Sequence, residues 1–189
     1  MAVKRAVFLD KDGTLVDDVP FNVDPERVRL ADGAGPALRR LQSLGFLLIV
    51  VTNQSGIARG LFDESALFVV RDRLAALLAA QDVTLDAFLH CPHWPHGRVA
   101  RLAYACECRK PRPGMLLHAA AEMDLRLDAS WMVGDILDDV EAGRRAGCRT
   151  VLIDNGNETE WRIDAMRRPH RLARDLAQAA DVIAAHPLQ

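Results

Sequence analysis

Two aspartates lie two positions apart in the segment Asp10-Lys11-Asp12-Gly13-Thr14, which directly follows a short apolar run. One carboxylate at such a place can attack a phosphorus atom and bind a divalent cation. The second can protonate a leaving oxygen and then activate water. Gly13 allows a sharp turn in which backbone amides can face phosphate oxygens. The pair therefore predicts phosphoryl chemistry.

Three more groups of polar residues follow later segments of the chain. They are Thr52, Asn53, Gln54 and Ser55 in the first group, Lys110 in the second, and Asp135 in the third, with Asp138 and Asp139 one helical turn on. The first group can hold phosphate oxygens without adding charge, and the lysine can supply a fixed cation. A further carboxylate beside Asp10 would complete a set of hard oxygen ligands, which Mg²⁺ prefers.

Three of the four cysteines fall in one short stretch that also contains histidines. The pattern C-x-H-x₁₂-C-x-C is formed by Cys91, His93, Cys106 and Cys108. In a reducing compartment this pattern indicates a metal before a disulfide. Three thiolates and one imidazole suit tetrahedral Zn²⁺, and because protein fills all four positions we expect a structural site. His90 and His96 are alternatives to His93.

Short apolar runs alternate with longer segments of helical periodicity between these groups. Predicted strands cover residues 6–9, 46–51, 87–90, 131–133 and 150–153. Predicted helices include one with Pro36 in its first turn and Gly45 as its stop, one capped by Asp63, then 114–123, 137–146 closed by Gly147, and 171–185. This alternation predicts an α/β fold with a doubly wound parallel sheet of the Rossmann-like type. Ligands bind such sheets at the carboxyl ends of the strands, where the polar groups fall.

The composition limits the classes of protein to which the chain can belong. With 189 residues, half of them hydrophobic, the chain suits one domain over residues 1–189 that includes the zinc loop 91–108. No apolar string approaches the ~20 residues of a membrane-spanning helix, so we expect a cytoplasmic protein without a membrane partner. A net charge of −2 argues against a nucleic-acid partner, and the lack of a heptad pattern predicts a monomer. A solvated helix face is predicted for the late arginines, Arg162, Arg167, Arg168, Arg171 and Arg174.

The order of nucleophile, hydroxyl, lysine and metal carboxylate along the chain resembles the haloacid dehalogenase superfamily of aspartyl-phosphate phosphotransferases. The resemblance covers about residues 6–154 and includes the DxDGT signature and the later GD. It implies that Asp10 is the nucleophile and a metal ligand, and that Asp12 is the general acid and base and offers a backbone carbonyl to the metal. It also implies that Thr52 and Lys110 stabilise the phosphoryl group and that Asp135 binds the metal.

Two longer motifs narrow the resemblance. VTNQSGIARG at residues 51–60 and CRKPRPGM at residues 108–115 resemble the D-glycero-D-manno-heptose 1,7-bisphosphate phosphatases, whose near relatives are histidinol-phosphate phosphatases. That family removes the C7 phosphate of a small phosphorylated sugar in nucleotide-heptose synthesis for lipopolysaccharide and other surface glycans. By position, the implied substrate contacts are Asp18, Phe21, Asn53, Gln54, Ser55 and Arg109. The resemblance also implies an open cleft without a large cap domain.

One position departs from the family pattern. Many members carry a basic residue directly after the metal aspartate, where this chain has Ile136. The rival enzymes are therefore a histidinol-phosphate phosphatase or a phosphatase for another small sugar phosphate. A rival of another class is a non-catalytic phospho-ligand binding module or phosphoacceptor domain. Asp12 argues against that class, because a pure acceptor has no use for an acid and base beside its nucleophile.

Overall fold

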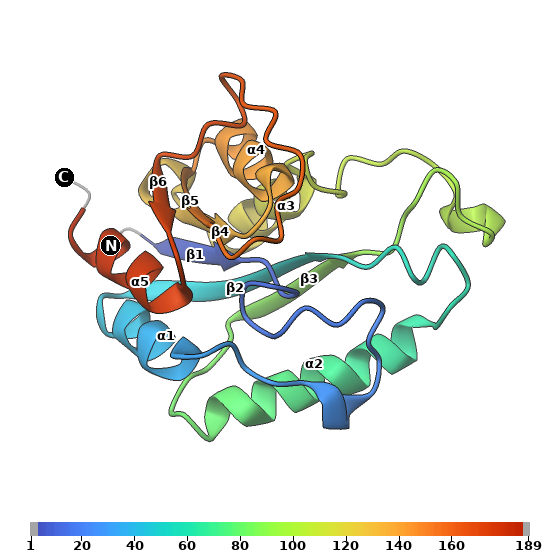
Figure 1. Ribbon diagram of the computed structural model, residues 1–189, viewed down its shortest axis with the longest axis horizontal. Helices are drawn as coiled ribbons and strands as arrows, with labels where there is room; N and C mark the ends of the chain where they lie inside the picture. The colour runs from blue at the N-terminus through green and yellow to red at the C-terminus, as the bar shows by residue number, and fades with distance from the viewer. Residues whose placement is uncertain (1–3, 187–189) are drawn as a thin grey trace.

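All six strands of the central sheet run parallel, in the order β3-β2-β1-β4-β5-β6. The computed structural model describes residues 4–186 (Figure 1). The strands are β1 Arg5–Leu9, β2 Phe46–Asn53, β3 Ala87–Cys91, β4 Trp131–Gly134, β5 Arg149–Ile153 and β6 Arg171–Ala173. The order reverses between β1 and β4, which creates the crevice where such sheets bind ligands.

Within residues 4–186, five α-helices cover the two faces of the sheet. They are α1 Ala34–Ser43, α2 Glu64–Ala79, α3 Gly114–Met123, α4 Leu137–Ala146 and α5 Leu176–Ala184, with 3-10 turns η1 Pro25–Arg27, η2 Ala100–Leu102 and η3 Leu127–Ala129. One apolar cluster joins the sheet to α1, α2 and α5, and a second joins its other face to α3 and α4 (Figure 1). In β1, Val7 and Leu9 belong to the first cluster, whereas Ala6 and Phe8 belong to the second. Burial on both faces explains why β1 is apolar from Ala6 to Leu9.

The predicted doubly wound fold is confirmed, and the predicted helix boundaries at Asp63, Gly45 and Gly147 agree with the structure. The Asp63 side chain accepts from the Ala66 N–H at 3.0 Å and caps α2. Gly45 and Gly147 follow α1 and α4 with φ of 82° and 88°, a conformation that L-residues rarely adopt. Within residues 4–186 no separate cap domain is inserted, and no helix is long and apolar enough to cross a bilayer.

The predicted helix over residues 171–185 is wrong in its first part. Arg171–Ala173 forms β6, which pairs with β5, and α5 begins only after Asp175, whose side chain accepts from the Gln178 N–H at 2.7 Å. A strand of three residues is too short for its alternation of side chains to be recognised in the sequence. Pairing with β5 outweighs the helix propensity of these residues. The late arginines consequently do not form a helix face, because Arg162, Arg167 and Arg168 lie in the loop before β6.

The segment between β3 and α3 leaves the edge of the sheet as a long loop, drawn in green to yellow at the right of Figure 1. It contains η2 and carries three of the four predicted zinc ligands beyond the end of β3. The loop returns to the sheet at Lys110, immediately before α3. Its path therefore links the cysteine cluster to the centre of the strand-end crevice.

Candidate active site

The nucleophile candidate Asp10 is held by the backbone of the sheet. Its N–H donates to the Val133 carbonyl at 3.0 Å, which extends the pairing of β1 with β4 by one residue. The chain then turns at Gly13, where φ is 81°, and Leu15 and Val16 both donate to the Lys11 carbonyl. Asp10 thus lies at the switch point of strand order with 8% of its surface exposed.

Three carboxylates converge at this point. Oxygens of Asp10, Asp135 and Asp139 all lie within 4.8 Å of one another. Burial and then the charge of Asp10 raise the pKa of Asp135 to about 6, although hydrogen bonds from Asn157 and Thr14 lower it. A hard divalent cation would relieve this repulsion, so the donor set fits Mg²⁺.

Lys110 neutralises part of that charge and is almost completely buried. Its ammonium pairs with Asp10 and, at 2.6 Å, with Asp139. Burial alone would lower the pKa of Lys110, but the two carboxylates raise it above its ordinary value. The lysine therefore stays charged and is aimed at the nucleophile.

Asp139 is a site residue to which the sequence analysis assigned no role. It lies in the first turn of α4 without exposure, and its second oxygen accepts from the Ile136 N–H at 3.3 Å. Both oxygens of Asp139 have protein partners, Lys110 and the Ile136 N–H, and Asp139 does not line the cavity that Asp10 and Asp135 line. Asp10 and Asp135 are therefore the carboxylates available to a metal there. The only feature of the sequence that pointed to Asp139 was its position four residues after Asp135, on the inner face of a helix.

Asn53 anchors the backbone of Lys110. Its side-chain amide donates to the Lys110 carbonyl and its side-chain oxygen accepts from the Lys110 N–H, both at 3.0 Å. This two-point contact joins the end of β2 to the end of the long loop. The Asn53 side chain, which is predicted to contact substrate, therefore holds Lys110 in position, and its contact with substrate stays a prediction.

Asp12 is held by Gln54 and Lys11. The Gln54 amide donates to Asp12 Oδ2 at 3.1 Å and to Thr52 Oγ1 at 2.9 Å, and the Lys11 ammonium pairs with Asp12 Oδ1. Burial raises the pKa of Asp12 and Asp10 adds to that rise, while Lys11 opposes it. A carboxyl with a raised pKa retains a proton more readily, which suits a general acid.

Most predicted site residues line two adjoining cavities at the strand ends. A cavity of about 210 Å³ is lined by Asp10, Asp12, Asp18, Thr52, Asn53, Lys110, Asp135, Ile136 and Asn157. A second of about 240 Å³ shares Asp12, Asp18 and Asn53 and adds Phe21, Gln54 and Ser55 among its lining residues. Ile136 thus lines the cleft. Arg109 lines neither cavity.

Arg109 instead lies against Trp94 in the long loop. Its guanidinium carbon is 4.5 Å from the Trp94 ring centre, and the Arg59 guanidinium carbon is 5.0 Å from the same centre. Arg59 also lies 5.5 Å from the ring centre of Phe21, which lines the second cavity. Arg59 was missed as a candidate, although it stands within the motif at residues 51–60. Two guanidiniums on one indole form a positive surface beside the cleft.

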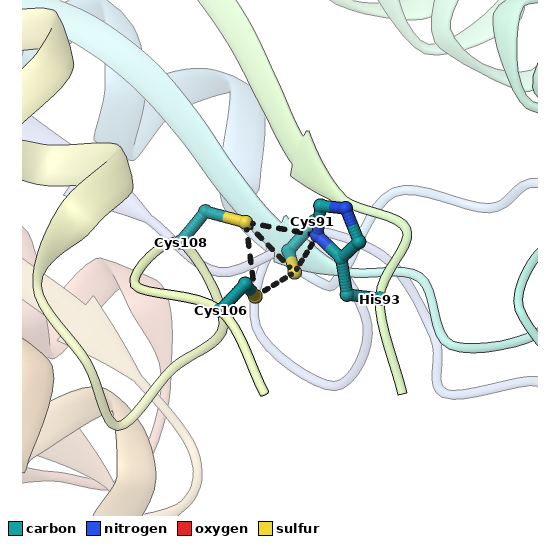
Figure 2. A group of neighbouring side chains, drawn as sticks. All are labelled: Cys91, His93, Cys106 and Cys108. Atoms are coloured by element: carbon teal, nitrogen blue, oxygen red, sulfur yellow. Dashed lines mark hydrogen bonds between the residues drawn. The ribbon is translucent and has the colours of Figure 1, made fainter. Parts of the chain in front are cut away.

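The four predicted zinc ligands form one cluster (Figure 2). The Cys108 sulfur lies 3.1 Å from Cys91 Sγ and 3.2 Å from Cys106 Sγ, and His93 Nδ1 lies 3.3 Å from Cys108 Sγ. The cysteines are free thiols. Such a compact set of three sulfurs and one imidazole nitrogen has the chemistry of a tetrahedral Zn²⁺ site.

The structure also distinguishes His93 from the alternative histidines. His90 Nε2 contacts Glu64 Oε1 at 2.9 Å, and His96 stacks edge-on against Trp94. His93 instead turns Nδ1 toward the sulfurs, while its Nε2 lies 2.7 Å from the Tyr104 hydroxyl. A partner on the second ring nitrogen is the usual way to orient a metal-binding histidine.

Comparison with known proteins assigns the chain to a family. The family model described as HAD-hydrolase-like matches residues 107–179. The D-glycero-β-D-manno-heptose-1,7-bisphosphate 7-phosphatase of Yersinia pestis is 43% identical over 152 residues, which are 80% of this chain and 81% of the relative. This chain belongs to the D-glycero-β-D-manno-heptose-1,7-bisphosphate 7-phosphatase family. The enzyme of that name from Escherichia coli (strain K12) is 40% identical over 170 residues, 85% of this chain and 89% of the relative.

Solved structures agree with this family. The D,D-heptose 1,7-bisphosphate phosphatase from B. bronchiseptica, complexed with magnesium and phosphate, superposes with a TM-score of 0.83 at 33% identity and covers 97% of this chain and 99% of its own. A HAD-like phosphatase from Mesorhizobium loti superposes with a TM-score of 0.84 at 37% identity and covers 97% of this chain and 86% of its own. The predicted superfamily, family and phosphatase class are therefore confirmed.

Proposed function

We propose that this chain is a Mg²⁺-dependent phosphatase that removes the C7 phosphate of D-glycero-D-manno-heptose 1,7-bisphosphate during nucleotide-heptose synthesis. The observation that carries the proposal is the convergence of five side chains on one cavity of about 210 Å³, those of Asp10, Asp12, Thr52, Lys110 and Asp135. Relatives of this name at about 40% identity support the choice of sugar.

In the first half-reaction the Asp10 carboxylate attacks phosphorus, and the bond from phosphorus to the sugar oxygen breaks. Asp12 gives its proton to that leaving oxygen, which yields the free C7 hydroxyl and an aspartyl-phosphate. In the second half-reaction Asp12 takes a proton from water, and the water oxygen attacks the phosphorus of the intermediate. Inorganic phosphate leaves and the Asp10 carboxylate is restored, so atoms and charge balance over the cycle.

The remaining site residues hold the phosphoryl group. The Lys110 ammonium and the Thr52 hydroxyl would contact its oxygens, because both line the cavity that Asp10 enters. The residues that would hold Mg²⁺ are Asp10 and Asp135 through carboxylates and Asp12 through its backbone carbonyl. A bound Mg²⁺ supplies positive charge that offsets the repulsion between the phosphate and the nucleophile.

A bisphosphate has a second anionic end, and the positive surface of Arg59 and Arg109 on Trp94 lies beside the cleft to receive it. Burial and the nearby Arg59 lower the pKa of Arg109, although neighbouring acidic groups oppose the shift. Stacking pre-orders both guanidiniums, so a phosphate dianion would bind them without further loss of side-chain freedom. A monophosphate would leave this surface unused.

Ile136 gives a test of substrate choice, because it lines the catalytic cavity at the position where the family pattern leads us to expect a basic residue. Ile136→Lys is expected to lower the Michaelis constant for the heptose 1,7-bisphosphate by about five- to a hundredfold, the range of one screened or hydrogen-bonded charge contact. Heptose monophosphates should change little. Ile136→Met controls for shape, and equal effects on both substrate classes would contradict a contact with the second phosphate.

We also propose that Cys91, His93, Cys106 and Cys108 hold a structural Zn²⁺ that orders the loop before Arg109 and Lys110. Cys106→Ser is expected to lose the copurified zinc and to lower turnover indirectly, because a structural zinc contributes folding energy to the segment it closes. Cys148→Ser, which changes a cysteine buried elsewhere, should retain one zinc per chain and its turnover. Metal analysis and phosphate release measure both effects, and full zinc in Cys106→Ser would show that the ligand set is wrong.

The substrate proposal is tested by phosphate release with Mg²⁺ over both anomers of the heptose 1,7-bisphosphate, heptose 7-phosphate, histidinol phosphate and other sugar phosphates. We expect the highest kcat/KM for a heptose 1,7-bisphosphate. A higher kcat/KM for histidinol phosphate would show that the proposed substrate is wrong, while the proposed mechanism would still apply. Turnover of none of them would support the non-catalytic class instead.

A further inference from the structure

The segment that follows β5 crosses back over the strand ends and contacts the site from the side opposite the long loop. The Asn155 amide donates to the Gly13 carbonyl at 2.7 Å, so the segment is tied to the turn after Asp10. Glu158 Oε2 accepts from the Leu137 N–H at 2.6 Å, at the first residue of α4. Between these two anchors lies Asn157, which lines the catalytic cavity.

Asn157 reaches the candidate metal carboxylate directly. Its amide donates to Asp135 Oδ2 at 2.7 Å, and the Thr14 hydroxyl donates to Asp135 Oδ1 at 3.1 Å. Each oxygen of Asp135 therefore has one donor, and the two contacts together fix the rotation of the carboxylate. Asp135 itself is 4% exposed, and the position of the carboxylate beside Asp10 depends on these partners.

The turn after β1 leaves no free space around this contact. A Cβ atom added to Gly13 would overlap both Asp135 Oδ2 and Asn157 Nδ2, and Gly13 has a φ of 81°. The hydrogen bond between Asn157 and Asp135 therefore lies directly against the backbone of the nucleophile loop. Glycine is required there both for conformation and for room.

We propose that Asn157 is a positioning residue that orients Asp135 for Mg²⁺, an inference that rests on the proposed function for the identity of the metal. Asn157 donates rather than ligates, because its amide nitrogen faces Asp135 and cannot bind a cation. Without the Asn157 donor, the Thr14 hydroxyl alone would contact the Asp135 carboxylate, and the carboxylate could rotate. Hydrogen-bond partners of metal ligands typically change metal affinity by about 10- to 100-fold when removed.

The test compares three variants of the full chain in the absence of substrate. Mg²⁺ binding is measured by calorimetry and, with Mn²⁺ as a probe, by paramagnetic resonance. Asn157→Ala is expected to weaken both by about 10- to 100-fold. Asn157→Gln retains an amide donor on a longer arm and should recover part of the loss. Thr159→Ala alters an exposed neighbour in the same segment and should bind Mg²⁺ within about twofold of the wild type.

Kinetic measurements distinguish a role of Asn157 in positioning Asp135 from a general disturbance of the folded site. In Asn157→Ala the Mg²⁺ concentration for half-maximal activity should rise by the same factor as the dissociation constant, while kcat at saturating Mg²⁺ stays near the wild-type value. Binding of Mg²⁺ by Asn157→Ala within twofold of the wild type would overturn the inference, and so would an equal loss in Thr159→Ala or no binding by the wild type. Because metal binding is measured without sugar, failure to hydrolyse a heptose bisphosphate would refute the proposed substrate and leave this inference standing.

Discussion

Replacing Asp10 with asparagine is expected to abolish phosphate release and to leave no covalent phosphoenzyme. An amide is not a nucleophile toward phosphorus, and the change also removes one of the two carboxylates proposed to hold Mg²⁺. Asp12→Asn should still bind substrate but lose proton transfer, for which about 10²- to 10⁴-fold in kcat is typical. Phosphate release and mass spectrometry of acid-quenched protein measure the two effects.

Asp17→Asn is the matched control, because Asp17 is an exposed carboxylate on the same loop that does not line the catalytic cavity. It should retain wild-type turnover. Near-normal turnover by Asp10→Asn would refute the aspartyl-phosphate mechanism. Equal losses in Asp12→Asn and Asp17→Asn would instead show that the loop, and not the proton, is responsible.

Lys110→Met is expected to cause large losses of both turnover and stability, for separate reasons. Removing one preorganised charge-stabilising group typically costs about 10²- to 10³-fold in kcat. Removing one partner of a buried ion pair typically costs about 3 to 5 kcal/mol of unfolding free energy, because Asp139 is left buried without its cationic partner. Urea unfolding and phosphate release measure the two losses independently.

The double variant Lys110→Met with Asp139→Asn separates the loss of stability from the loss of turnover. Asparagine keeps the shape of Asp139 and can still accept from the Ile136 N–H, but it carries no charge that needs a cationic partner. Stability should return most of the way to the wild-type value, while turnover stays as low as in Lys110→Met. Arg39→Met, at an exposed ion pair with Asp82, serves as the control and should change stability much less. A double variant no more stable than Lys110→Met would contradict the buried-pair account.

The sequence by itself predicted the candidate residues of the reaction and determined the fold that presents them. Asp10, Thr52 and Asp135 each directly follow, or end, an apolar strand, and the carboxyl ends of neighbouring parallel strands meet at one edge. Local periodicity and caps such as Asp63 and Gly147 located most elements, because these signals act within a few residues. The spacing of the cysteines predicted the cluster of Cys91, His93, Cys106 and Cys108 that the structure shows.

Only the tertiary structure decided which partners these residues meet. Lys110 pairs with Asp139, Asn53 binds the Lys110 backbone, and Asn157 donates to Asp135. The two residues of each pair lie too far apart in the sequence for a local pattern to connect them. The same holds for residues 171–173, where pairing with β5 outweighs a helical sequence. Such contacts form because the order of strands brings separate loops to one edge of the sheet, and burial there makes the geometry of each polar side chain depend on its partner.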